Sequence, residues 1–198
     1  MTRILKITLP VILLIAILIG IAIGIAKPIA KPIDQGIYNM LHTYLNIDVI
    51  KQYLYFVSTI FDPKICLILT LCVLAVLFFY HKFKFLWYGF WCFSVFLIGT
   101  FMKYVIQRSR PSEHFDGYSF PSMHVLSVCI LVSLILLIKR NKTLYCIAII
   151  LVASIIVSRI YVGAHYFTDT MGSLLVISVM IQSLNYNNHA SEKLDKIE

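Results

Sequence analysis

The chain has 198 residues, of which 60% are hydrophobic and only 13% are charged, and its mean hydropathy is +0.88. Soluble domains are nearer half apolar and a quarter charged, so this composition excludes an ordinary soluble domain and indicates an integral membrane protein. The net charge of +8 would also suit a nucleic-acid partner. The basic residues, however, are scattered at the ends of apolar runs, so we expect no nucleic acid and instead a lipid bilayer.

The first apolar run, residues 7–26, follows Arg3 and Lys6 and is broken only by Pro10 and two glycines. About twenty apolar residues cross the hydrocarbon core of a bilayer, whereas the core of a signal peptide is shorter. The run therefore predicts a first transmembrane helix, with a cleaved signal peptide as the alternative.

The stretch from residue 27 to 62 is more polar and contains two amphipathic patterns, with Asp34 and Asp48 as candidate helix caps. Apolar residues recur there at helical spacing, namely Ile37, Met40, Leu41, Tyr44 and Leu45, then Ile50, Leu54, Val57 and Phe61. Both patterns are too mixed to cross a membrane. They predict either interfacial helices beside the mouth of a bundle or plain packing between spans.

Five further apolar runs complete the expected fold. Asp62 and Pro63 are typical of a helix start, with an N-cap followed by proline at the first helical position. The predicted spans are 63–80, 85–106, 121–138, 144–157 and 168–184, followed by a polar tail over 185–198. The chain is thus expected to be all-α, a single domain over 1–184 that forms a bundle of six transmembrane helices.

Basic turns predict the orientation of this bundle. Six spans place both termini on one side, and the basic turns at 82–84 and 139–142 fall on that same side. The positive-inside rule makes this side cytoplasmic. We therefore expect a multi-pass protein of the cell membrane. The helix ends that lie opposite the basic turns should face the extracytoplasmic side.

Three segments meet on that outer face and carry reactive residue types. If the chain around His165 is helical, Asp169 shares its face and can hold one imidazole nitrogen. By itself this pair fits a nucleophile or base, and equally a satisfied histidine near a helix end. The segments read Lys103-(six residues)-Arg110-Pro111, Pro121-Ser122-Met123-His124, and Ser158-Arg159-(five residues)-His165-(three residues)-Asp169.

The same segments hold groups that suit a phosphate. Lys103, Arg110 and Arg159 supply three cations, and arginine can bind a phosphate group through two parallel hydrogen bonds. Pro121 and Ser122 open a helix whose free N–H groups attract anions, and the Ser122 hydroxyl adds a donor. As ordinary boundary residues, the cations would instead extend to the membrane interface.

Together, the three segments resemble the signature of the type-2 phosphatidic acid phosphatase superfamily of membrane lipid phosphatases. The first and third match at every signature position, while the second has Met123 where glycine is common, which leaves open the local backbone shape and the pocket size. The resemblance covers about residues 60–184. Whether Arg108, Glu113, His114 or Asp116 contacts substrate also stays open.

The resemblance implies a phosphatase that hydrolyses a lipid phosphate or diphosphate at the outer leaflet through a phosphohistidine. It assigns His165 as nucleophile, Asp169 as the group that holds its ring, and His124 as the acid that protonates the departing oxygen and then activates water. The implied phosphate-binding residues are Lys103, Arg110, Ser122 and Arg159. No cofactor or metal is expected, because Glu113 and Asp116 are too few to hold magnesium.

The physiological lipid remains open among undecaprenyl diphosphate, phosphatidylglycerol phosphate and phosphatidic acid. The main alternative is a catalytically silent membrane protein that binds or transports phospholipid, which predicts that a catalytic residue is missing, and none is. A haloperoxidase is disfavoured by the six predicted spans and the lack of a large soluble domain. The oligomeric state is not predicted.

Overall fold

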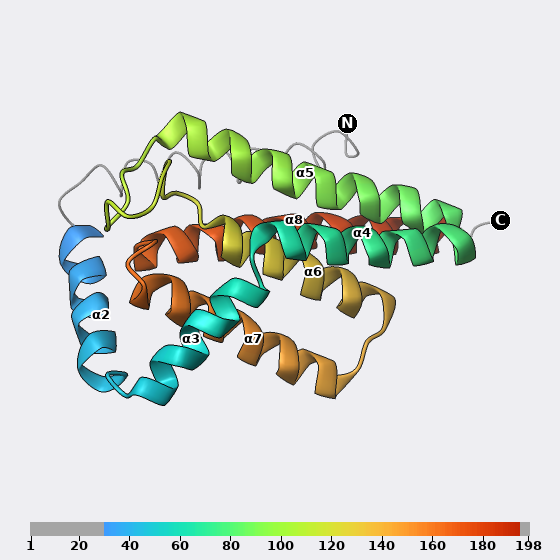
Figure 1. Ribbon diagram of the computed structural model, residues 1–198. Coiled ribbons are helices and arrows are strands. Elements are labelled where there is room, and N and C mark those ends of the chain that lie inside the picture. Colours follow the sequence, from blue (N-terminus) through green and yellow to red (C-terminus); the bar gives the residue numbers. More distant parts are fainter. Residues whose placement is uncertain (1–29, 195–198) are drawn as a thin grey trace.

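The structure is a computed structural model that describes residues 30–194, all of it in helices and their connections (Figure 1). The all-α prediction is confirmed for this part of the chain, whereas the predicted first span lies outside the described residues. The helices are α2 (Ala30–Tyr44), α3 (Asp48–Ile60), α4 (Pro63–Tyr80), α5 (Lys82–Ile106), α6 (Met123–Ile138), α7 (Lys142–Tyr161) and α8 (Phe167–Leu194).

Among the described residues, three helices are long and apolar enough to cross a membrane, namely α4, α5 and α7. They correspond to the second, third and fifth predicted spans. Helix α6 and the apolar part of α8, Phe167–Gln182, are shorter and occupy the fourth and sixth. That the bundle has six transmembrane spans therefore remains a prediction.

Helix α6 forms the centre of the bundle and packs against α4, α5, α7 and α8. Its residues 125–131 are all buried, as expected of a helix that is apolar on every side. The outer helices instead expose large apolar side chains, and Phe83 and Phe101 of α5 are 89% and 66% exposed. Such outward apolar faces suit helices that are surrounded by lipid.

The two amphipathic patterns form helices, but neither Asp34 nor Asp48 is the N-cap residue that the pattern predicted. Asp34 lies inside α2 and is buried, while Asp48 is preceded by the N-cap residue Ile47 and pairs with Lys51 at 3.2 Å. Each candidate cap stands within its helix because the chain becomes helical earlier than the apolar pattern indicates. The apolar face of α3 packs on α7, which favours the packing interpretation for this segment.

The predicted helix start at α4 is confirmed. Asp62 is the N-cap, its Oδ1 accepts a hydrogen bond from the backbone N–H of Lys64 at 2.9 Å, and Pro63 is the first helical residue. This cap joins α3 to α4 at the end of the bundle where the three signature segments lie.

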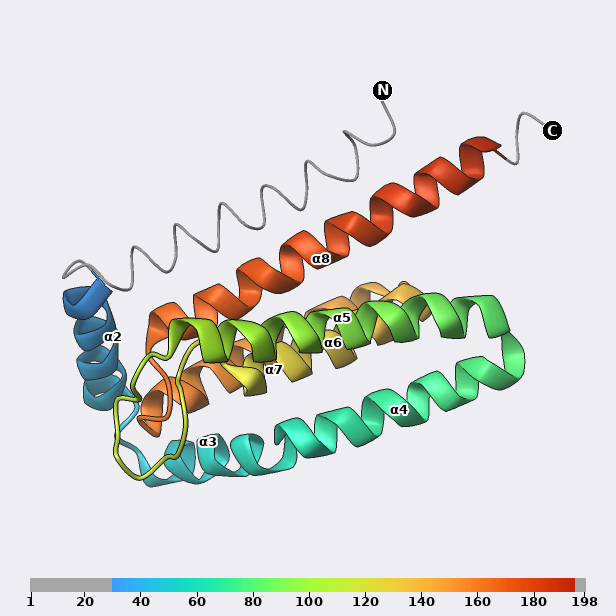
Figure 2. The same ribbon diagram turned by 90° about the horizontal axis from the view of Figure 1, so that it is seen from above.

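All three signature segments gather at that one end. The end of α5, the loop over 107–122, the start of α6, and the turn from α7 to α8 lie together there, and α2 crosses beside them (Figures 1 and 2). The antiparallel course of α5, α6, α7 and α8 brings these segments together, because each begins or ends at this edge. The fold therefore positions a candidate site at one end of the helices.

Candidate active site

The turn from α7 to α8 holds His165 in a buried position. Gly163 has a φ of +70°, a conformation that glycine adopts most readily, and it turns the chain after α7. The backbone N–H groups of Ala164 and His165 then both donate to the carbonyl of Arg159 at 3.2 Å. The His165 side chain is only 2% exposed, so its ring is held in one place.

Hydrogen bonding determines which nitrogen of His165 is free. Its Nδ1 lies 2.7 Å from the carbonyl oxygen of Ser119, an acceptor, so Nδ1 carries the proton and Nε2 keeps a lone pair. Burial lowers the pKa of His165 to about 4, although Asp169 acts in the opposite direction. The ring is therefore neutral near pH 7, as a nucleophile must be.

Asp169 lies beside the ring of His165, as its spacing predicted, but it does not accept a hydrogen bond from the ring. Its Oδ2 lies 3.7 Å from Nδ1 of His165, too far for a hydrogen bond, and it accepts instead from the backbone N–H of Tyr166 at 2.9 Å. Its Oδ1 accepts from Arg108 at 2.6 Å. Asp169 thus secures the start of α8 and acts on His165 by charge, while the Ser119 carbonyl orients the ring.

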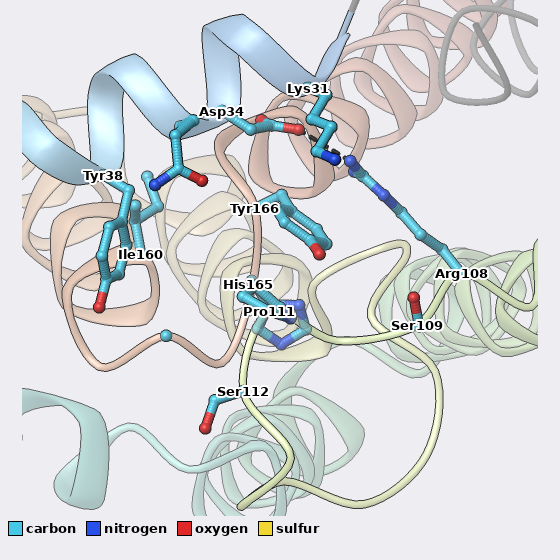
Figure 3. Close-up of a pocket in the computed structure, with 12 residues that line it drawn as sticks. Lys31, Asp34, Tyr38, Arg108, Ser109, Pro111, Ser112, Ile160, His165 and Tyr166 are labelled. Carbon is cyan, nitrogen blue, oxygen red and sulfur yellow. Dashed lines mark hydrogen bonds and ion pairs between the residues drawn. The ribbon is translucent and has the colours of Figure 1, made fainter. Parts of the chain in front are cut away.

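A buried network that the sequence reasoning missed connects α2 to this carboxylate. Arg108 bridges Asp169 and Asp34. It donates to Asp34 Oδ2 at 2.7 Å, and its guanidinium carbon lies 4.0 Å from the ring centre of Tyr166 (Figure 3). Asp34 also accepts from the backbone N–H and the hydroxyl of Thr168, each at 3.0 Å. Arg108, left open by the sequence, therefore positions other residues.

The candidate phosphate-binding arginines lie close together around Phe115. The guanidinium carbons of Arg110 and Arg159 are 5.9 Å and 5.5 Å from the centre of its ring, within the range of cation–π attraction. Arg110 donates to the carbonyls of Asp116 and Ala164, each at 2.9 Å. No motif or spacing pointed to Phe115, because only the folded loop brings it close to both arginines.

Two buried polar atoms in this region have no hydrogen-bond partner among the described residues. They are the hydroxyl oxygen of Ser122 and Nε of Arg159, and both side chains are almost fully buried. A buried polar group without a partner is costly, and such groups in native proteins call for an explanation. Donors left free at the same end of the bundle fit a site that receives an anion.

The remaining cation and the second histidine lie near these donors. Lys103 donates to the carbonyl of Tyr118, and its charge acts on His124, as do those of Arg110 and Arg159. His124 stands in the first turn of α6, half-buried, with Nε2 3.7 Å from Oδ2 of Asp62. The structure therefore brings all predicted site residues to one end of the bundle.

Two cavities open at this end. The first, about 520 Å³, lies between α2, the loop after α5 and the turn from α7 to α8. Its lining includes Lys31, Asp34, Tyr38 and His165 (Figure 3). The second, about 690 Å³, is lined by Arg110, Arg159 and His124 with parts of α3 and α4. Arg110 links the two, because its Nη1 lies 3.4 Å from Nε2 of His165.

Lys103, Ser122 and Asp169 are not among the lining residues of either cavity. Of the four loop residues left open, Arg108 lines the first cavity and Asp116 lines the second, whereas Glu113 and His114 line neither and are exposed. Within the described part of the chain, no three His, Cys, Asp or Glu side chains converge as a metal site would require.

Met123, the departure from the usual glycine, packs away from the cavities. Its sulfur lies 3.4 Å from the point where a Cβ on Gly99 of α5 would stand, and Met123 lines neither cavity. The absence of a side chain at Gly99 provides room for Met123 and for Leu126. The larger residue is thus accommodated between α5 and α6 rather than in the site.

Comparisons with known proteins identify a family and relatives of this chain. The model of the PAP2 superfamily matches residues 65–190. Phosphatidylglycerophosphatase B of Bacillus subtilis is 32% identical over 115 residues, which are 50% of this chain and 55% of that protein. The match therefore spans about half the length of this curated relative.

Two solved structures share the fold. A transmembrane PAP2-type phosphatidylglycerolphosphate phosphatase from Bacillus subtilis superposes with a TM-score of 0.74 at 22% identity, covering 91% of this chain and 96% of that one. LpxE of Aquifex aeolicus gives a TM-score of 0.60 at 17% identity, covering 77% and 94%. Together with the apolar helices, this fold indicates a membrane location.

Proposed function

Because the chain belongs to the PAP2 superfamily, we propose that it is a metal-independent phosphatase that hydrolyses a lipid phosphate or diphosphate through a phosphohistidine. The observation that carries this proposal is the state of His165, which is buried, donates through Nδ1, and holds the lone pair of Nε2 next to Arg110. A neutral imidazole beside a cation that can bind phosphate is suited to attack phosphorus.

In the first step, Nε2 of His165 forms a bond to phosphorus as the bond to the departing oxygen breaks. Arg110, Arg159 and Lys103 stabilise the negative charge on the remaining phosphate oxygens, and the hydroxyl of Ser122 donates to one of them. His124 gives its proton to the departing oxygen. The lipid leaves with an intact hydroxyl, or with a phosphate if the substrate is a diphosphate.

In the second step, water attacks the phosphohistidine. His124, now neutral, takes a proton from the water as its oxygen bonds to phosphorus, and the bond from phosphorus to Nε2 breaks. Inorganic phosphate leaves, and both histidines return to their first protonation states. The carbonyl of Ser119 supports both steps, because it keeps the proton of His165 on Nδ1.

The proposed setting is the outer leaflet of the cell membrane. Exposed apolar side chains on α4 and α5 suit contact with lipid, so the tails of a substrate can stay in the bilayer while its head group enters at the end of the helices. Among the candidate lipids, the name of the Bacillus subtilis relative makes phosphatidylglycerol phosphate the first to test, before undecaprenyl diphosphate and phosphatidic acid.

The test is phosphate release by the purified protein in detergent with EDTA present, across these three lipids and a water-soluble ester. We expect release that resists EDTA and falls at least about 10³-fold in His165→Ala, because the nucleophile is lost. Substantial residual turnover in that variant would remove His165 as nucleophile. No release on any substrate from a folded sample would favour a silent lipid-binding or transport protein.

A further inference from the structure

The two oxygens of the Asp62 carboxylate face different partners. Oδ1 accepts the backbone N–H of Lys64 and caps α4, while Oδ2 lies 3.7 Å from Nε2 of His124. The cap holds the carboxylate in place, so the second oxygen faces the imidazole as a consequence of how α4 begins. One oxygen of this capping residue is thus directed at the proposed acid.

We propose that Asp62 is a positioning residue for the reaction, which keeps His124 protonated until the lipid oxygen departs. This inference rests on the proposed function, since it assigns the partner of the acid in that same site. No one of the three signature segments contains Asp62, which precedes the first by about forty residues.

The charges around His124 show why such a partner is needed. Burial is the largest influence that lowers the pKa of His124. The positive charges of Arg159 from α7, His165 from the next turn, Arg110 from the loop and Lys103 from α5 act in the same direction. An opposite charge within about 4–6 Å favours the charged form of a titratable group. At 3.7 Å, the Asp62 carboxylate meets that condition.

Two other charged side chains line the same cavity, Lys64 from α4 and Asp116 from the loop. Their charges have opposite signs, and neither forms an ion pair with His124 among the described residues. Asp62 differs from both because it is held by the cap and forms an ion-pair contact with the imidazole.

The distance also leaves the proton of His124 available. A gap of 3.7 Å is longer than a hydrogen bond, so the proton on Nε2 is not committed to Asp62. The carboxylate therefore stabilises the imidazolium by charge, while a departing oxygen can still accept the proton. Its side chain is 42% exposed, so solvent screens the attraction and the expected effect is moderate.

The test variant is Asp62→Asn, because asparagine is as good an N-cap as aspartate but has no charge. Asp62→Ser, also a good cap, removes the second oxygen altogether. Asp48→Asn is the matched control, since the Asp48 side chain is 90% exposed and, among residues 30–194, pairs only with Lys51. The three variants are measured for thermal stability in detergent and for the pH dependence of kcat on an alkyl and an aryl phosphate.

We expect Asp62→Asn to keep the stability of the unmodified protein and to move the alkaline limb of kcat on the alkyl ester to lower pH by about half to one unit. The shift is toward lower pH because the rate depends on protonated His124. Without the carboxylate, His124 loses its proton at a lower pH. The loss at pH 8 should be about three- to tenfold on the alkyl ester and less than about twofold on the aryl ester, because an aryl oxygen needs less protonation.

An unchanged pH profile in a stable Asp62→Asn protein would overturn the proposal, and so would equal losses on both esters. Lower stability with an unchanged profile would reduce Asp62 to a helix cap. Failure of the proposed function would look different, because the unmodified protein would then release no phosphate and have no profile to shift.

Discussion

The two histidines of the site stand in contrasting surroundings. His165 is 2% exposed, is hydrogen-bonded through Nδ1, and lies beside a carboxylate that Arg108 and a backbone N–H hold fixed. His124 is 16% exposed at the edge of an open cavity, and its nearest carboxylate lies beyond hydrogen-bond distance. The side of the site around His165 is closed and held by hydrogen bonds, whereas the side around His124 is open.

This difference matches the two tasks. A nucleophile must keep one nitrogen unprotonated and aimed at phosphorus, which rigid contacts accomplish. An acid that later serves as a base must exchange its proton with a departing oxygen and then with water, which requires access. The site therefore separates attack from proton transfer by how tightly each ring is held.

The largest effect should come from the open side. In the first turnover, His124→Ala should slow an alkyl phosphate by about 10²- to 10⁴-fold and an aryl phosphate much less, since only the alkyl oxygen needs the proton. The phosphohistidine should then accumulate on the aryl substrate, because water lacks its base. Rapid mixing with labelled phosphate ester measures both.

For this variant, His81→Ala is the matched control, because His81 is exposed where α4 meets α5. Equal slowing of alkyl and aryl esters would argue against His124 as the acid.

A smaller effect should follow from loosening the closed side. Asp34→Asn weakens the contact with Arg108, which also binds Asp169, so we expect kcat to fall about tenfold and the free energy of unfolding to fall by about 1–3 kcal/mol. Steady-state kinetics and thermal unfolding in detergent measure these changes. The Asp48→Asn substitution should change neither quantity. An unaltered kcat in Asp34→Asn would mean that the contacts of Asp34 hold α2 in place without affecting the active site.

The closed side also predicts how stability depends on pH. Burial lowers the pKa of His165 to about 4, whereas an unfolded histidine titrates near 6.5. Between these values the unfolded state binds a proton that the folded state excludes, so stability should fall as the pH is lowered from about 6.5 to 4. His165→Asn should show a smaller fall in melting temperature over this window. The same slope in both proteins would contradict the buried neutral ring.

The smallest effect on activity is expected at Met123, which packs against α5 outside both cavities. Met123→Gly should change kcat/KM less than about threefold, yet lower the free energy of unfolding by about 1–3 kcal/mol through lost packing and a flexible helix start. A large change in KM with normal stability would show that this side chain shapes the pocket after all.

The sequence alone determined the local features of this protein. Apolar runs predicted the helices α4 to α8, and Asp62 with Pro63 marked the start of α4, because hydrophobic spacing and capping depend on neighbouring residues. The order of the predicted spans and the family resemblance placed Lys103, Arg110, Ser122, His124, Arg159, His165 and Asp169 in one set, and the fold does gather them. The prediction that Asp34 caps a helix was wrong. An acidic residue at the edge of an amphipathic pattern resembles a cap even when it pairs with a distant residue in the fold.

Only the tertiary structure decided which group each of these residues contacts. Asp34 and Arg108 are 74 positions apart, and Ser119 and His165 are 46 apart, so no spacing in the sequence relates them. The nearby aspartate looked like the natural partner of His165, but the start of α8 turns Asp169 toward a backbone N–H and Arg108. Helix packing brings distant segments into contact, and this packing decides that His165 is oriented by a carbonyl and that Asp62 faces His124.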